Sequence, residues 1–522
     1  MERSIYPLQM EECCDEPPKY LSPRASGILL PISALPGVHG IGDIGPTALR
    51  WLEFLHESGQ KLWQILPIHP TGYGNSPYQS TSAMAYNPLL ISLEQLAYDG
   101  LLSRADFDDY PRTPPNCVEY EQLIPVREKL LAKAAEKFLK NSRLSGYNKF
   151  LEEQSWLEDY ALFEAISGQF PGHAWSEWPE ALRHRETDAL EKIRRELAPE
   201  LAIGKVKQYF FHSQWRWLRQ RAHRFAIKII GDMPIFVAHH SADVWSNPEL
   251  FDLQSSGMPR VVAGVPPDYF SETGQRWGNP LYRWEKHATT HYAWWAGRLR
   301  YAMDLYDVVR IDHFRAFADY WEIPASEETA IHGTWREGPG SNFFSELRAQ
   351  LGELPIIAED LGILSDTAVK LRDQLGIPGL RVLLFAFDGD DPKSPFLPEN
   401  YTENCVAYTG THDNDTALGT FSVNGAGKMR WVMLKKYLPE TYVDFQFPKN
   451  LLYWLAHSPA RWVIYPMQDV LGLDSRARTN SPGIPENNWK WKLTGDELTP
   501  ELKTLLYQLG LRQKSFKNGP SQ

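Results

Sequence analysis

Short apolar runs recur along this chain, and each ends at a glycine, a proline or a polar residue. Runs of this length, alternating with stretches of helical periodicity, are typical of parallel strands that are buried on both faces. Eight strands are predicted, at 27–31, 62–67, 225–232, 308–312, 355–359, 379–384, 405–409 and 462–465. Eight strand–helix repeats predict an α/β fold of the (β/α)8 or TIM-barrel type, with the active site at the carboxyl ends of the strands.

The interval between the second and third predicted strands is far longer than one strand–helix unit of about 30 residues requires. Amphipathic patterns within this interval predict helices at 92–102, 126–139 and 187–197. We therefore expect a helical insertion at about 91–205.

A second long interval, at about 240–300, is rich in Trp, Pro and Gly, and we expect it to form a loop insertion over the barrel mouth. The barrel with both insertions would occupy 24–512. An N-terminal extension (1–23) and a C-terminal tail (513–522) would flank it as frayed ends.

Composition and charge narrow the classes of partner. The 522 residues include 54 Lys and Arg against 65 Asp and Glu, a formal charge of −11. Because nucleic-acid binding needs clustered basic residues, this balance argues against a nucleic-acid partner. No apolar run of about 18 residues occurs, so we expect no membrane span. Four unevenly spaced cysteines, without a CxxC pair, indicate a reducing compartment and a cytoplasmic protein.

Three motifs have the residue types of cofactor or metal sites without the sequence context that such sites require. Residues 40–45 match GxGxxG, but two prolines and about ten residues separate them from the nearest predicted strand, whereas a dinucleotide fingerprint follows its strand directly. His239, His240 and Asp243, and likewise His412, Asp413 and Asp415, match no metal-binding pattern. We expect no cofactor and no metal.

Three carboxylates at predicted strand ends are the strongest chemical signal. Asp312 and Glu359 end the fourth and fifth strands, and Asp413 follows the seventh. Any one of them could be a helix N-cap, which is a common position for an acidic residue. Three at the ends of barrel strands would instead meet at one mouth.

This arrangement suits cleavage of a glycosidic bond with retention of configuration. That reaction needs one carboxylate as nucleophile and a second, protonated carboxyl group as acid, about 5–5.5 Å apart. Arg310 lies two residues before Asp312 and points to the same side of the strand, where its charge would keep Asp312 ionised. Glu359 must be desolvated enough to keep its proton near neutral pH.

With these residues in place, the sequence resembles the amylomaltase (4-α-glucanotransferase, disproportionating enzyme) family, a branch of the α-amylase clan. The resemblance extends from about residue 26 to about residue 493. The segments that carry it are SGILLP (26–31), GYGNSPYQ (72–79), GDMPI (231–235), VPPDYF (265–270), QRWGNP (275–280), RIDHFR (310–315), AED (358–360) and THDNDT (411–416).

The resemblance implies roles for individual residues. Asp312 matches the nucleophile, Glu359 the acid/base, and Asp413 the third carboxylate, which holds sugar hydroxyls beside the cleaved bond. The other matches are to residues that bind or surround the substrate: Arg310 and His412 line the subsite, Tyr78 is an aromatic platform, Trp277 lies in a loop over the acceptor side, and Asp232 is a more structural position. The family also implies no separate C-terminal β-domain.

The expected activity is therefore transfer of an α-1,4-glucan segment to the 4-hydroxyl of another glucan or of glucose, through a covalent glycosyl–enzyme. Malto-oligosaccharides, amylose and glycogen- or starch-derived glucans are the expected substrates. Two alternatives stay open at this point: a plain α-glucan hydrolase with the same carboxylates, and a non-catalytic glucan-binding scaffold. The oligomeric state is open between a monomer and a weak dimer.

Overall fold

The structure is a computed structural model, and it describes residues 19–140, 145–267, 271–362, 364–422, 426–484 and 486–511. The strands are Ala25–Leu29 (β1), Leu62–Gln64 (β2), Lys228–Pro234 (β3), Val261–Val265 (β4), Gln275–Pro280 (β5), Val308–Asp312 (β6), Asp319–Pro324 (β7), Thr334–Glu337 (β8), Ile356–Ala358 (β9), Gly379–Val382 (β10), Cys405–Tyr408 (β11) and Trp462–Pro466 (β12).

The helices up to β6 are Pro46–Glu57 (α1), Leu93–Tyr98 (α2), Tyr120–Leu139 (α3), Ser145–Glu153 (α4), Leu157–Gln169 (α5), Glu180–Arg183 (α6), Thr187–Glu196 (α7), Ala198–Arg224 (α8), Ala242–Ser246 (α9), Trp284–Thr289 (α10) and Ala293–Leu305 (α11). Those after β6 are Gly340–Leu351 (α12), Asp366–Gln374 (α13), Ala417–Thr420 (α14), Ala426–Tyr437 (α15), Lys449–Ala456 (α16), Met467–Leu471 (α17) and Pro500–Leu511 (α18).

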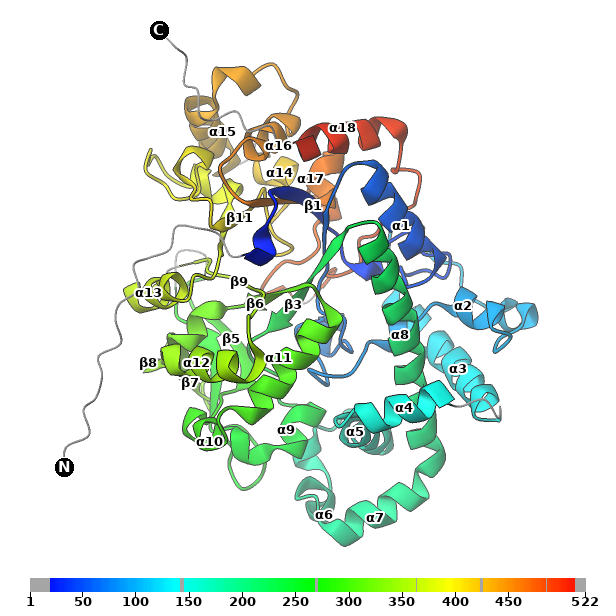
Figure 1. Cartoon of the computed structure of the whole chain (residues 1–522). Coiled ribbons are helices and arrows are strands. Elements are labelled where there is room, and N and C mark those ends of the chain that lie inside the picture. Colours follow the sequence, from blue (N-terminus) through cyan, green and yellow to red (C-terminus); the bar gives the residue numbers. More distant parts are fainter. Residues whose placement is uncertain are drawn as a thin grey trace, which may run out of the picture.

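Eight parallel strands close into a barrel in the order β1-β12-β11-β10-β9-β6-β3-β2. Each coincides with one of the eight strands predicted from the apolar runs, so the predicted barrel is confirmed. The clearest difference is at β3, which begins at Lys228 instead of 225 because α8 continues to Arg224. Helices surround the barrel, and α18 lies beside α1 although the two are far apart in the sequence (Figure 1).

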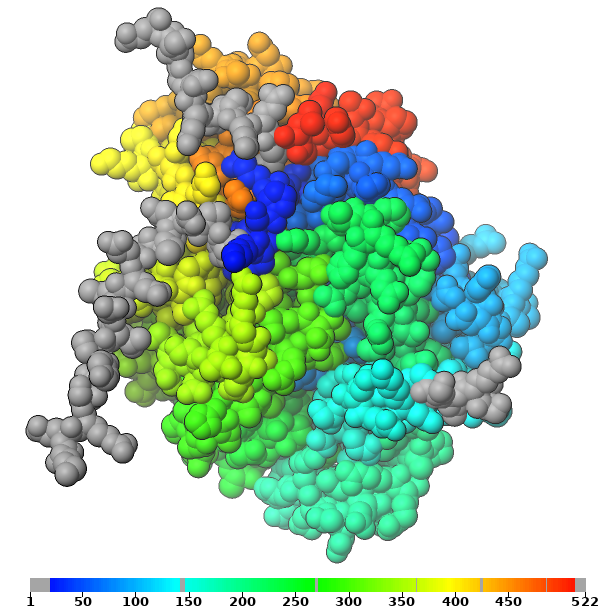
Figure 2. All heavy atoms as spheres, viewed as in Figure 1, coloured from blue at the N-terminus to red at the C-terminus, as the bar shows by residue number. Residues whose placement is uncertain are grey.

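The interval after β2 is helical, as the amphipathic patterns predict. Helices α2, α3 and α7 cover most of the three predicted segments, and α8 packs against α3 and α5 before it leads into β3. The boundary expected near 205 lies inside α8, because one continuous helix serves both the insertion and the barrel crossover. In the space-filling view the insertion forms a lobe at one side of the barrel (Figure 2).

The region 240–300 contains more regular structure than the expected loop. Strands β4 and β5 from this region join β7 and β8 in a four-stranded antiparallel sheet of order β5-β4-β7-β8. Helices α9 and α10 also belong to the region 240–300. Strand β4 pairs with β7, which lies 57 to 63 residues farther along the chain and beyond β6, so no local sequence pattern predicts the assembled sheet. Two of its strands precede β6 and two follow it, and β5 positions Trp277.

The ends of the chain fall mainly outside the described residues, namely 1–18 of the expected N-terminal extension and 512–522, which include the expected tail. In the part of the chain that is described, no sheet follows β12, in agreement with the expected lack of a separate C-terminal β-domain. None of the described helices combines the length and apolar character that crossing a bilayer requires.

Candidate active site

Strands β6 and β9 bring Asp312 and Glu359 side by side. The two strands are paired with Ile311 opposite Ala358, so the next residue of each strand lies beside the other at the carboxyl end of the barrel. The Glu359 N–H donates to the Ile311 carbonyl (3.0 Å), and the Phe314 N–H donates to the Glu359 carbonyl (3.0 Å). The pairing therefore continues past the strand ends and holds the two acidic residues in register.

Arg310 links the base of the site to Asp312. One guanidinium nitrogen donates to both carboxylate oxygens of Asp232, at 2.7 and 2.8 Å, and another lies 2.9 Å from Asp312 Oδ1. The Arg310 and Asp232 side chains are 3% and 0% exposed, whereas the Asp312 side chain is 30% exposed. Of the two carboxylates that Arg310 contacts, Asp312 is thus the accessible one, and the buried Asp232 orients Arg310.

Glu359 is held by backbone donors. The His313 N–H donates to Oε2 (2.7 Å), and the Leu361 N–H donates to Oε1 (2.9 Å). Burial, reinforced by the nearby charge of Asp312, raises the pKa of Glu359 to about 7, although Arg310 and the two N–H groups oppose the shift. A carboxyl group that is still protonated close to neutral pH can donate a proton to a leaving oxygen.

Asp413, His412 and Tyr78 form a second cluster at the mouth. His412 Nε2 lies 3.2 Å from Asp413 Oδ2, and the His412 ring stacks on Tyr78 with centroids 5.0 Å apart. The Tyr78 hydroxyl donates to Asp232 (2.9 Å), which joins this cluster to Arg310. Burial would raise the pKa of Asp413, but His412 and the Asn480 amide outweigh it and lower the pKa to about 2.

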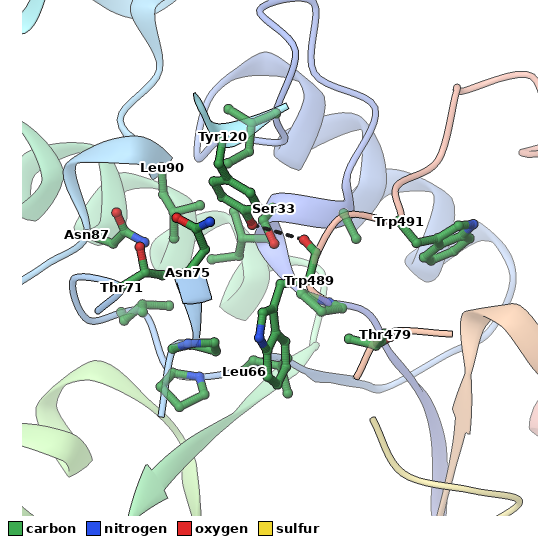
Figure 3. A pocket seen from close by; sticks show the side chains of 17 residues that line it. Ser33, Leu66, Thr71, Asn75, Asn87, Leu90, Tyr120, Thr479, Trp489 and Trp491 are labelled. Atoms are coloured by element: carbon green, nitrogen blue, oxygen red, sulfur yellow. Dashed lines mark hydrogen bonds between the residues drawn. The ribbon is translucent and has the colours of Figure 1, made fainter. Parts of the chain in front are cut away.

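The segment after β12 completes this cluster, and the sequence analysis did not identify it. The Asn480 side-chain amide donates to Asp413 Oδ1 (2.6 Å), and Arg478 donates to the Asp413 carbonyl (2.7 Å). Trp489 lies against Tyr78 and His412, with centroids 5.9 and 6.1 Å away. Its carbonyl accepts a hydrogen bond from Tyr120, and a small pocket adjoins it (Figure 3). The unusual density of Asn, Pro and Trp at 480–491 is the one signal that could have indicated a folded-back loop.

Trp277 lies on β5, close to the turn that follows Asp312. Its ring packs edge-to-face on the His313 ring with centroids 4.8 Å apart. Tyr269, from the VPPDYF segment of the same insertion, lies outside the described residues.

The structure therefore brings all eight predicted site residues into one connected site. Asp232, Arg310, Asp312, Tyr78, His412 and Asp413 are joined by direct contacts, and His313 joins Glu359 and Trp277 to them. Within the described residues, no three His, Cys, Asp or Glu side chains are grouped so as to hold a metal ion. The histidine pair at 239–240 instead lies against the helical insertion, where His240 Nδ1 accepts a hydrogen bond from the N–H of Trp175 (3.0 Å).

Comparison with known proteins identifies the family. A family model described as 4-alpha-glucanotransferase matches residues 30–499. The chain is 46% identical to a 4-alpha-glucanotransferase of Thermus thermophilus, covering 92% of this chain and 96% of the relative. It is 41% identical to a chloroplastic/amyloplastic 4-alpha-glucanotransferase of Solanum tuberosum, covering 92% and 85%. The chain belongs to the 4-alpha-glucanotransferase family.

Solved structures agree with this assignment. The amylomaltase of Streptococcus agalactiae, solved in complex with acarbose, superposes with a TM-score of 0.90 at 39% identity and covers 93% of this chain and 98% of its own. The amylomaltase of Corynebacterium glutamicum, at 20% identity and a TM-score of 0.77, shares the fold. As a member of the 4-alpha-glucanotransferase family, the chain is an enzyme of the transferase class, and the scaffold alternative is ruled out.

Proposed function

We propose that this enzyme cleaves an α-1,4 bond of a malto-oligosaccharide or longer glucan and transfers the non-reducing-side fragment to the 4-hydroxyl of an acceptor glucan or glucose. The observation that carries the proposal is the register of Asp312 and Glu359 on neighbouring strands. One of these carboxyl groups is accessible beside Arg310, and burial keeps the other protonated.

In the first step, Glu359 donates its proton to the glycosidic oxygen while Asp312 attacks the anomeric carbon. The bond between that carbon and the leaving oxygen breaks, a bond to the Asp312 carboxylate forms, and the reducing-side fragment departs with the proton. The 2.9 Å contact of Arg310 with Asp312 supports the role of Asp312, because a neighbouring guanidinium favours an ionised carboxylate.

In the second step, Glu359 has become a carboxylate and accepts the proton of the acceptor 4-hydroxyl. The acceptor oxygen attacks the anomeric carbon from the face the leaving group vacated, so two inversions give overall retention. Glu359 regains its proton, Asp312 is released, and the enzyme is ready for another donor.

Asp413, His412 and Tyr78 would bind the sugar at the cleaved bond. The low pKa of Asp413 supports a role as an ionised hydrogen-bond acceptor for sugar hydroxyls. The Tyr78 ring, stacked on His412, offers the flat apolar surface that suits a sugar ring.

Transfer prevails over hydrolysis only when a bound acceptor outcompetes water, which is present at about 55 M. We assign this selectivity to the acceptor side, where Trp277 packs over His313 and would exclude water. The rival function, plain hydrolysis, uses the same carboxylates and differs only in its products.

Incubation with pure maltotriose tests the proposal. We expect a ladder of longer malto-oligosaccharides together with glucose, seen by chromatography, and Asp312→Asn should abolish both. Glucose and maltose without longer products would identify a hydrolase instead.

We also propose that the enzyme acts in the cytoplasm on soluble glucans, as a monomer or weak dimer without a nucleic-acid or membrane partner. The formal charge of −11 and the free thiol of Cys117 support this setting.

A further inference from the structure

His313, between the proposed nucleophile and the helical turn that follows it, has an unfavourable backbone conformation. Its φ and ψ are 51° and 47°, in the left-handed region that residues with a side chain seldom adopt. Such conformations persist where the surrounding structure imposes them, and they concentrate at functional sites. A glycine at this position would relieve the strain, so the presence of histidine needs a reason.

The backbone of His313 acts on Glu359. In this conformation its N–H points at Glu359 Oε2, 2.7 Å away, and the next N–H, of Phe314, reaches the Glu359 carbonyl. Two successive N–H groups thus hold the side chain and the main chain of the same residue. In an extended conformation the strand would continue past Asp312, and His313 could not make this turn toward Glu359.

The ring of His313 acts on the acceptor side. It meets the Trp277 ring edge-to-face, with centroids 4.8 Å apart and planes at 90°. Three charged groups influence the ring: Asp312, Arg315 and Asp319. Burial, assisted by Arg315, outweighs the two carboxylates and lowers the pKa of His313 to about 4, so the ring is neutral at neutral pH and adds no charge beside Glu359.

We propose that His313 is a positioning residue with two separable parts: its left-handed backbone orients the acid/base Glu359, and its ring fixes Trp277 of the acceptor side. A single residue then sets the distance between the proton donor and the aromatic group that covers the acceptor. This inference rests on the proposed function and extends it. It also accounts for the histidine, because glycine would supply the backbone without the ring.

Substitutions at position 313 separate the two parts. His313→Gly and His313→Asn remove the ring, but both residues accept the left-handed conformation, whereas His313→Val removes the ring and strongly disfavours that conformation. We expect all three to lower the ratio of transfer to hydrolysis from maltotriose severalfold, the same effect that we expect of Trp277→Ala. A double variant with Trp277→Ala should lower it no further, because the two changes remove one contact.

Only His313→Val should move the pH profile. Loss of the N–H donor to Oε2 disfavours the ionised form of Glu359, so its pKa rises and the basic limb of kcat/KM for maltotriose cleavage moves to higher pH. We expect a shift of about half a unit to one unit, with a further drop in kcat of about tenfold relative to His313→Gly.

His291 supplies the matched control. It has the same left-handed backbone, with φ of 50°, at an exposed turn between α10 and α11. His291→Gly and His291→Val should change thermal stability without moving the basic limb or the transfer ratio.

If the basic limb of the kcat/KM profile lies at the same pH in the His313→Gly and His313→Val variants, the proposed role of the His313 backbone is wrong. A transfer ratio that His313→Gly leaves unchanged, or that falls additively with Trp277→Ala, would overturn the ring part. A wild-type enzyme that releases glucose without longer chains would refute the proposed transfer function instead, and the pH profiles of cleavage would still decide the backbone part.

Discussion

Glu359 and Asp413 are acidic residues at the mouth of the same barrel, and they differ in what surrounds them. Among the described residues, only backbone N–H groups donate to Glu359, and burial raises its pKa to about 7. Asp413 pairs with the His412 ring and the Asn480 amide, and its pKa falls to about 2 despite burial. The partners of each carboxyl group, and not the residue type, therefore support Glu359 as the proposed proton donor and Asp413 as the proposed permanent anion.

The two residues also differ in where their partners come from. The donors to Glu359 belong to its own strand end and to the neighbouring strand. Asn480 and Arg478, which hold Asp413, come from the segment after β12, 67 and 65 residues farther along the chain. The acid is thus built into the barrel, whereas the third carboxylate depends on a loop that folds back onto it.

Replacing the acid should give the largest effect. Glu359→Gln removes the proton donor, and we expect kcat on maltotriose to fall about a thousandfold or more. An α-maltosyl fluoride donor should restore the first step, because fluoride leaves without protonation. Asp413→Asn should lose activity on both donors, since sugar binding and not protonation is impaired. Near-normal activity of Glu359→Gln on maltotriose would refute the assignment.

Removing the hydrogen bond from Asn480 to Asp413 should have an intermediate effect. Asn480→Ala deletes a hydrogen bond to a charged group, worth roughly 1.5–3 kcal/mol, so kcat/KM should fall about 10- to 100-fold. The pKa of Asp413 should rise at the same time, which moves the acid limb of the pH profile upward. Unchanged kinetics would show that His412 alone maintains Asp413.

The pH dependence of the wild-type enzyme checks the ionisation of Glu359. Because its pKa is raised to about 7, the residue is protonated below that pH and loses its proton as the pH rises through it. We therefore expect the pH profile of kcat/KM for maltotriose to have a basic limb near pH 7, above which kcat/KM falls about tenfold per pH unit. The maltosyl fluoride reaction should lack this limb in its first step, and a limb shared by both donors would point to another group.

Opening the acceptor side should have the smallest effect on cleavage. Trp277→Ala removes the ring that packs on His313, and we expect donor consumption to change only a fewfold while water gains access. The ratio of free glucose to longer oligosaccharides from maltotriose should shift toward hydrolysis, with Trp277→Phe as the conservative control. An unchanged product pattern would contradict the proposed role of Trp277 in excluding water from the acceptor side.

Much of the fold was predictable because barrel strands leave a local signal. Each run of buried residues is short, apolar and followed by a helical period, and all eight predicted runs became barrel strands. The small sheet β5-β4-β7-β8 was missed because its two halves pair across β6, and because most positions of β5, β7 and β8 are partly or fully exposed, so these three strands carry no continuous apolar run.

The sequence by itself determined the barrel and the position of Asp312 and Glu359 at its carboxyl end, since both follow from strand pattern and register. The tertiary structure alone decided which carboxyl group keeps its proton and what holds Asp413. It also decided that His313 turns back onto Glu359. Those properties depend on burial and on contacts between residues distant along the chain, such as Asn480 with Asp413, and no local pattern of hydrophobic and polar residues encodes them.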